Sequence, residues 1–262
     1  MATILITGST DGLGRALASA LAGRGDEVLV HGRDPGKVAD AAADVGATGA
    51  YVADLSSLEQ VRRLAEEVQR DRDTLDVLVN NAGIVVPERR ESADGYELGF
   101  AVNYLAGFLL TAELLDALRG SAPGRVVNVA SIGQHPIDFD DVMLERDYDP
   151  MRSYSQSKLA QIMHAFELAE RVPPAELTTA ALHPATLMDT KMVLQSYGRA
   201  MSSVEEGVEA TLHAIDSEGT GSYFDGTEQA QPHRQAYDAE ARRRLWELSE
   251  ELTGVRVPTR AA

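Results

Sequence analysis

The 262-residue sequence contains no cysteine, one tryptophan and few aromatic residues of any kind. The absence of cysteine excludes disulfide bonds and thiolate metal sites. A chain without disulfides is compatible with a reducing compartment, and we expect a cytoplasmic location. The 44% of apolar residues can still bury one large core, because α/β domains of this length are often single.

Basic residues are also scarce, since 24 Lys and Arg stand against 41 Asp and Glu, which gives a formal net charge of −17. A surface with this charge repels phosphate backbones unless its basic residues gather on one face. The densest basic run, residues 242–244, is flanked by acids on a predicted helix, which is typical of a solvated face. We therefore expect no nucleic-acid partner.

Long apolar runs are missing as well. The longest, residues 100–118, is interrupted by Asn103, Glu113 and Asp116 and falls short of the roughly 20 residues of a membrane span. Residues 1–6 lead directly into a glycine-rich turn, so we predict no signal sequence. The expected partners are small molecules, with no membrane contact.

The chain alternates short apolar runs with helical segments, which is typical of βαβ units around a parallel sheet. Most of the predicted strands are almost entirely apolar, as expected for strands buried on both faces. We predict one α/β domain over residues 1–262, with a doubly wound, seven-stranded and mainly parallel sheet. The predicted strands are Thr3 to Ile6, Glu27 to His31, Gly49 to Ala53, Val77 to Asn80, Val126 to Ala130, Thr178 to Leu182, and Ser222 to Phe224.

Three segments break this alternation: residues 132–152, residues 186–202 and the tail after Asp225. Loops of this length are usually functional or mobile. The tail contains a predicted helix over residues 238–252, whose apolar stripe includes Leu245 and Trp246. This stripe can dock onto the same domain or onto a second subunit.

A glycine-rich turn, residues 7–14, follows the first predicted strand. Gly8 permits a tight turn, Gly12 allows the backbone to approach a pyrophosphate, and Gly14 allows close packing of helix on strand. The GxxxGxG spacing can also serve a purely structural turn, but its place between a strand and a helix favours a dinucleotide site.

The end of the second predicted strand bears on cofactor choice. Arg33 suits the 2′-phosphate of NADP(H), whereas a carboxylate at this place favours NAD(H). Asp34 could be that carboxylate, but it precedes Pro35, and an N-cap aspartate before a helix-starting proline is a simpler interpretation. Asp54, after the third strand, could accept a hydrogen bond from adenine or begin the next helix. We predict NADP(H), with NAD(H) as the alternative.

Tyr154 and Lys158 lie four residues apart on a predicted helix and therefore share one face. A phenol has a reference pKa of about 10, so it exchanges protons poorly at neutral pH unless a cation stabilises the phenolate. Lys158 can provide that cation. The sequence Asn80-Asn81-Ala82-Gly83 ends the fourth strand, where its amides can tie strands together and its small residues admit a cofactor, or where it forms an ordinary turn at the sheet edge.

The sequences TGSTDGLG, NNAG and YSQSK, together with Ser131, resemble the short-chain dehydrogenase/reductase family over nearly the whole chain. The resemblance implies a three-layer, Rossmann-type fold, with Tyr154 as general acid/base, Lys158 lowering its pKa and binding ribose, and Ser131 contacting the substrate carbonyl. It further implies that Asn103 supports a water-mediated proton relay, although Asn103 can also be an ordinary polar residue of an apolar helix. The implied cofactor-binding residues are Gly8, Thr10, Asp11, Gly12, Leu13, Gly14, Arg33, Asp54, Leu55, Asn81, Ala82, Gly83, Tyr154, Lys158 and Pro184.

The 23-residue separation of Ser131 and Tyr154 and the surrounding sequence look like the retinol-dehydrogenase-like branch, which implies a lipophilic carbonyl or alcohol substrate. Ala185 stands where the family often has glycine. The family also implies a homodimer or homotetramer and a substrate lid at about residues 186–202. The predicted lid lining is Leu187, Met188, Met192, Val193, Leu194 and Tyr197.

Two other functions are compatible with the same fold. A dinucleotide-binding regulator or scaffold needs no catalytic set, so Ser131, Tyr154 and Lys158 argue against it. An epimerase would use the same machinery without net consumption of cofactor. His135 and His183 have no metal-ligand spacing, and we predict no metal site.

Overall fold

The fold is built on one eight-stranded sheet, seen in a computed structural model that describes residues 1–190 and 199–257. The strand order is β3-β2-β1-β4-β5-β6-β7-β8. Neighbouring strands from β3 to β7 pair in parallel, and β8 pairs antiparallel to β7. The strands are β1 Thr3–Ile6, β2 Glu27–Gly32, β3 Gly49–Val52, β4 Val77–Asn80, β5 Gly124–Val129, β6 Leu177–His183, β7 Ser222–Asp225 and β8 Glu228–Gln229.

The predicted doubly wound α/β fold is confirmed, with one strand more than the seven expected. The additional strand, β8, is only two residues long, which is too short for any alternation of apolar and polar residues to show in the sequence. Strands β2, β5, β6 and β7 are each one or two residues longer than predicted, and β3 is one residue shorter.

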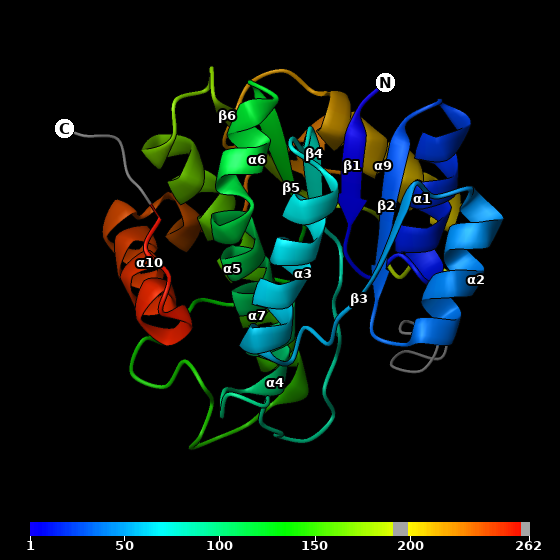
Figure 1. Ribbon diagram of the computed structural model, residues 1–262. Coiled ribbons are helices and arrows are strands. Elements are labelled where there is room, and N and C mark those ends of the chain that lie inside the picture. Colours follow the sequence, from blue (N-terminus) through cyan, green and yellow to red (C-terminus); the bar gives the residue numbers. More distant parts are fainter. Residues whose placement is uncertain (191–198, 258–262) are drawn as a thin grey trace.

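Helices cover both faces of the sheet (Figure 1). Alternate strand residues enter two separate apolar clusters, as Ile4 and Ile6 do on one face and Leu5 does on the other. Helices α1, α2 and α9 pack on the first face, and α3, α5, α7 and α10 belong to the cluster on the second. The described helices are α1 Gly12–Gly23, α2 Pro35–Val45, α3 Leu58–Asp71, α4 Leu98–Phe100, η1 Ala101–Leu105, α5 Ala106–Glu113, α6 Leu115–Gly120, α7 Pro150–Arg171, α9 Val204–Asp216, η2 Arg234–Tyr237 and α10 Ala239–Thr253.

The apolar stretch at residues 100–118 forms α5, α6 and a π-helical turn, η1, and most of its apolar side chains are buried in the second cluster. Among the described helices, none is long and apolar enough to cross a membrane.

Helix α10 docks on its own chain. Asp238 caps its first turn, and Gly254 ends it with φ +68°. The Trp246 ring is buried, with its centroid 5.0 Å from that of Phe108 and 5.8 Å from that of His164. Of the two predicted partners for this apolar stripe, the same domain is therefore the one observed.

Candidate active site

The strand order reverses between β1 and β4, so the loops after these strands diverge and leave a crevice at the carboxyl ends of the sheet. The glycine-rich turn occupies this place. Gly8 has φ +66° and Gly12 has φ +52°, a region that side-chain-bearing residues rarely adopt. A Cβ on Gly14 would lie 2.4 Å from the Gly8 carbonyl oxygen, so only glycine allows α1 to begin this close to the turn.

The residues of this turn fit the pyrophosphate of a dinucleotide. Asp11 is the N-cap of α1 and accepts a hydrogen bond from the Gly12 amide at 2.9 Å. The first turn of α1 carries no acidic residue beyond this N-cap, so its remaining backbone N–H groups can face the phosphates of a dinucleotide. Thr10 packs against the end of β2 near Gly32, and Leu13 is buried beneath the turn.

Arg33 directly follows β2 and is exposed. Arg15, on α1, instead forms an ion pair with Asp44. Asp34 is the N-cap of α2 and accepts from the Lys37 amide at 3.0 Å, which supports the capping interpretation of this residue. Arg33 thus differs from Arg15 and Asp34. Among the described residues, its side chain neither caps a helix nor pairs with an acid.

Asp54 forms a turn and does not cap the next helix. Its Oδ1 accepts from the Ser56 amide at 2.9 Å, whereas the N-cap of α3 is Ser57. The interpretation that Asp54 begins the helix is wrong, because the chain makes a tight turn first. Leu55 lies beside this turn and is buried.

The residues at the end of β4 tie three strands together. Asn80 donates from Nδ2 to Asn128 Oδ1 on β5 at 2.9 Å, and Asn81 donates from Nδ2 to the Thr7 carbonyl at 2.8 Å. The Asn81 and Ala82 amides both donate to Thr7 Oγ1. The predicted strand-tying role of the amides is therefore present.

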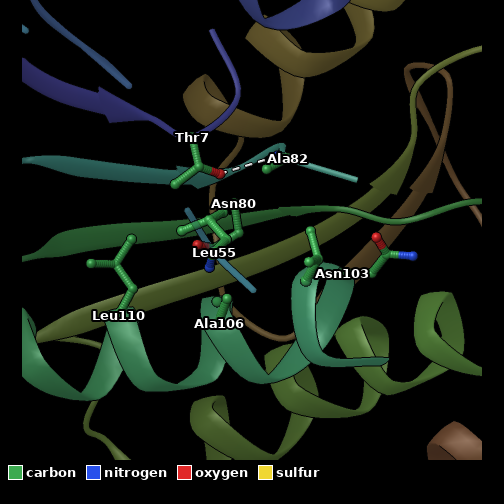
Figure 2. Close-up of a pocket in the computed structure, with 9 residues that line it drawn as sticks. Thr7, Leu55, Asn80, Ala82, Asn103, Ala106 and Leu110 are labelled. Carbon is green, nitrogen blue, oxygen red and sulfur yellow. Dashed lines mark hydrogen bonds between the residues drawn. The ribbon is translucent and has the colours of Figure 1, made fainter. Parts of the chain in front are cut away.

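A small cavity of about 10 Å³ lies below these residues, between β4 and α5, with room for about one water molecule (Figure 2). Asn80 and Ala106 approach it from opposite sides, and Asn80 Oδ1 has no hydrogen-bond partner among the described residues. Its volume excludes a substrate or a cofactor. The lining residues are Thr7, Leu55, Asn80, Ala82, Val102, Asn103, Ala106, Gly107 and Leu110.

Lys158 and Tyr154 lie one turn apart on α7. The Lys158 ammonium is 5.5 Å from the centre of the Tyr154 ring and donates to the Val129 carbonyl at 2.8 Å and to Gln161 Oε1 at 2.9 Å. Burial lowers the pKa of Lys158 to about 7. A Cβ on Gly83 would lie 3.3 Å from this ammonium, so the glycine after β4 leaves space beside the Lys158 side chain.

Asn103 sits in the π-helical turn η1, and its side chain makes three hydrogen bonds. Its Oδ1 accepts from the Ile84 amide at 2.8 Å, and its Nδ2 donates to the Ile84 carbonyl at 3.0 Å and to Ser157 Oγ at 2.9 Å. The side chain thus links the segment after β4 to α7. These bonds use both N–H groups of the amide and one lone pair of its oxygen.

Ser131 lies two residues beyond β5 and is held by its neighbours. Its Oγ accepts from the Gly133 amide at 3.1 Å. Its carbonyl accepts from Gln134 Nε2 at 3.0 Å and from the Tyr223 hydroxyl at 3.2 Å, so β7 also supports this residue.

The predicted lid is described only at its two ends. Residues 187–189 and 201–202 are joined by backbone hydrogen bonds, from Met201 N to the Leu187 carbonyl at 2.9 Å and from Asp189 N to the Ser202 carbonyl at 3.0 Å. Met188 is half-buried and packs against the first-face cluster beside Gly207, and its prediction as substrate lining stays a prediction. Met192, Val193, Leu194 and Tyr197 lie outside the described residues. Pro184 lines an open groove of about 380 Å³ next to this segment.

Comparison with known proteins agrees with this geometry. The model of the short chain dehydrogenase family matches residues 2–198. This chain belongs to that family. The short-chain dehydrogenase described here is 35% identical to human retinol dehydrogenase 13 over 285 residues, which span 98% of this chain and 86% of that protein. It is 34% identical to human retinol dehydrogenase 12 over 274 residues, 97% of this chain and 86% of that protein.

Solved structures show the same fold. The crystal structure of an uncharacterized protein from Mycobacterium paratuberculosis has a TM-score of 0.82 and 31% identity, covering 98% of this dehydrogenase and 95% of that chain. The Pseudomonas aeruginosa RhlG/NADP active-site complex has a TM-score of 0.69 and 27% identity, covering 86% of this dehydrogenase and 94% of that chain. The resemblance to retinol-dehydrogenase-like members, predicted from the sequence, is confirmed.

The structure also reveals functional neighbours that the sequence analysis missed in this dehydrogenase. Gln161, the partner of Lys158, could have been found from its i, i+3 spacing on the same helix. His31, which binds the Gly8 amide, could have been noticed as a polar residue in an otherwise apolar strand. Gln134 and Tyr223 carried no local signal, because only the fold brings them to Ser131. Among the described residues, no cluster of three or more His, Asp or Glu side chains could hold a metal.

Proposed function

We propose that this protein transfers a hydride between NADP(H) and a lipophilic carbonyl or alcohol, with Tyr154 as general acid/base. The observation that carries the proposal is the placement of the buried Lys158 ammonium, 5.5 Å from the centre of the Tyr154 ring and beside Gly83, which has no side chain to hinder a ribose. The similarity to retinol dehydrogenases favours a lipophilic substrate. Arg33 favours NADP(H), and a bound NADP in the RhlG complex is consistent with that choice.

Each side chain has a defined task in this proposal. The bound nicotinamide supplies or accepts the hydride. The Tyr154 hydroxyl moves a proton to or from the substrate oxygen, and the Lys158 ammonium stabilises the phenolate when that proton leaves. Ser131 donates a hydrogen bond to the same oxygen, from a backbone held by Gln134 and Tyr223.

Absorbance of the reduced nicotinamide measures turnover by the purified protein. We would supply NADPH or NADH together with aldehydes, ketones, quinones and polyketide-like carbonyls. Tyr154→Phe should lower kcat by about 10² to 10⁴ while the Kd for NADPH stays constant. Tyr237→Phe is the matched control, because Tyr237 is exposed and lies on η2. Binding of NADPH without turnover of any substrate would contradict the enzyme and favour a regulator, and product without net cofactor consumption would favour an epimerase.

The cytoplasmic location and the homodimer or homotetramer stay proposals. Any contact between subunits has to use a surface other than the Trp246 side of α10, because that side is buried within the chain. Light scattering on the purified protein and fractionation of cells would test the two statements.

A further inference from the structure

The peptide unit between Thr7 and Gly8 is held at both of its polar ends, by a side chain of β2 and by one directly after β4. Its carbonyl, on Thr7, accepts from Asn81 Nδ2 at 2.8 Å. Its N–H, on Gly8, donates to His31 Nδ1 at 3.2 Å. Because Gly8 adopts φ +66°, the orientation of this peptide decides how the turn leaves β1. Asn81 belongs to a recognised part of the site, whereas His31 does not.

His31 also connects the turn to the third strand. Its Nε2 lies 3.1 Å from the carbonyl oxygen of Ala53, the residue before Asp54. Its backbone carbonyl accepts from the Ser9 amide at 2.9 Å, and its backbone amide donates to Ser9 Oγ at 2.9 Å. The imidazole thus lies between the pyrophosphate side and the adenosine side of the predicted cofactor site.

A single neutral tautomer satisfies both contacts of the ring. A carbonyl oxygen facing Nε2 requires that nitrogen to carry the proton, which leaves Nδ1 as the acceptor that the Gly8 N–H needs. The ring is buried, and burial lowers the pKa of His31 to about 4. The imidazole is therefore neutral at physiological pH, in the form that holds the peptide.

We infer that His31 is a positioning residue for dinucleotide binding, which acts by fixing the Thr7–Gly8 peptide in the orientation that the glycine-rich turn requires. The inference rests on the proposed function for the identity of the ligand. Loss of the His31 contact would leave the half-buried Gly8 N–H without its acceptor, a loss that favours other orientations of this peptide. Part of the free energy of NADPH binding would then be used to return the Thr7–Gly8 peptide to its orientation in the turn, so the Kd for NADPH would rise.

Two substitutions separate the two contacts of the ring. In His31→Asn the amide oxygen can take the place of Nδ1 and accept from Gly8. In His31→Gln the amide nitrogen reaches toward the place of Nε2 and keeps the bond to Ala53, but leaves the Gly8 N–H without an acceptor. We expect His31→Gln to raise the Kd for NADPH about tenfold or more, and His31→Asn to raise it less than threefold.

Two measurements decide the outcome: the NADPH Kd by calorimetry, and exchange of the Gly8 amide by NMR in the protein without cofactor. The Gly8 amide should be protected in the wild type and in His31→Asn, and should exchange at least tenfold faster in His31→Gln. Equal Kd values for the two variants, or an unprotected Gly8 amide in the wild type, would overturn the inference. A purely structural role would lower the Tm of both variants without separating their Kd values.

The wild type distinguishes this inference from the proposed function. If the wild type bound no dinucleotide, the proposed function would be overturned. The role of His31 in dinucleotide binding would then be overturned too, even if the Gly8 amide were protected. Tight binding by the wild type and by His31→Gln alike would overturn only the role of His31. If neither variant folds, protection of Gly8 in the wild type still tests the contact.

Discussion

Gln161 accepts a hydrogen bond from Lys158, with 2.9 Å between its Oε1 and the lysine Nζ, from one turn further along α7. Gln161 is itself buried, so water does not compete for this bond. The acceptor favours the charged form of a lysine whose pKa burial has already lowered to about 7.

Gln161→Leu should therefore lower the pKa of Lys158 further, since the ammonium loses an acceptor. In the pH profile of kcat/KM, the alkaline limb should move to lower pH by about one unit. Gln161→Glu should move it to higher pH, because a carboxylate favours the ammonium. Identical limbs in both variants, with circular dichroism spectra like that of the wild type, would show that Gln161 does not influence Lys158.

Arg33→Ala should raise the KM for NADPH about tenfold or more and leave the KM for NADH nearly unchanged. The reason is that a 2′-phosphate loses a charge-assisted hydrogen bond that a 2′-hydroxyl never made. Arg15→Ala is the matched control, because Arg15 is paired with Asp44. A larger effect of Arg15→Ala on the KM for NADPH would move the phosphate site to α1.

His164 should make the protein sensitive to acid. Burial lowers its pKa from 6.5 to about 4, so between these values the unfolded state binds a proton that the folded state does not. The free energy of unfolding should fall as the pH drops through this window, with up to about 1.4 kcal/mol per pH unit from this residue.

Urea unfolding of the wild type and of His164→Leu from pH 7 to pH 4 measures this contribution. The slope against pH should be smaller in the variant by up to that amount, whatever the variant loses in stability at pH 7. Parallel slopes would mean that His164 is protonated equally in both states.

Trp246→Ala should lower the free energy of unfolding by about 3 to 5 kcal/mol, because a buried indole leaves a cavity between α10 and the helices beneath it. Circular dichroism has to report the unfolding, since Trp246 is the single tryptophan. Arg243→Ala, on the exposed side of α10, should change stability by less than about 0.5 kcal/mol. A loss of similar size in Arg243→Ala would contradict the docking of α10 through Trp246.

The fold was predictable because its signals are local. Runs such as residues 77–79 are apolar throughout, and the predicted N-cap at Asp34 before Pro35 appears in the structure. Strand β8 and the start of β5 escaped prediction, because a two-residue strand has no period and Gly124-Arg125 does not look apolar. Arg125 is nevertheless buried, since its guanidinium donates to the Ala214 carbonyl and to Ser217 Oγ.

The sequence by itself determined the family, the order of the strands along the chain and the residue types at the site, because glycine spacing, apolar runs and the Tyr154–Lys158 spacing depend only on near neighbours. The tertiary structure decided which distant groups complete that site. His31 meets Gly8 across 23 residues, and Tyr223 meets Ser131 across 92. Such pairs depend on strand order and register, which bring buried polar groups together so that each finds a hydrogen-bond partner away from water.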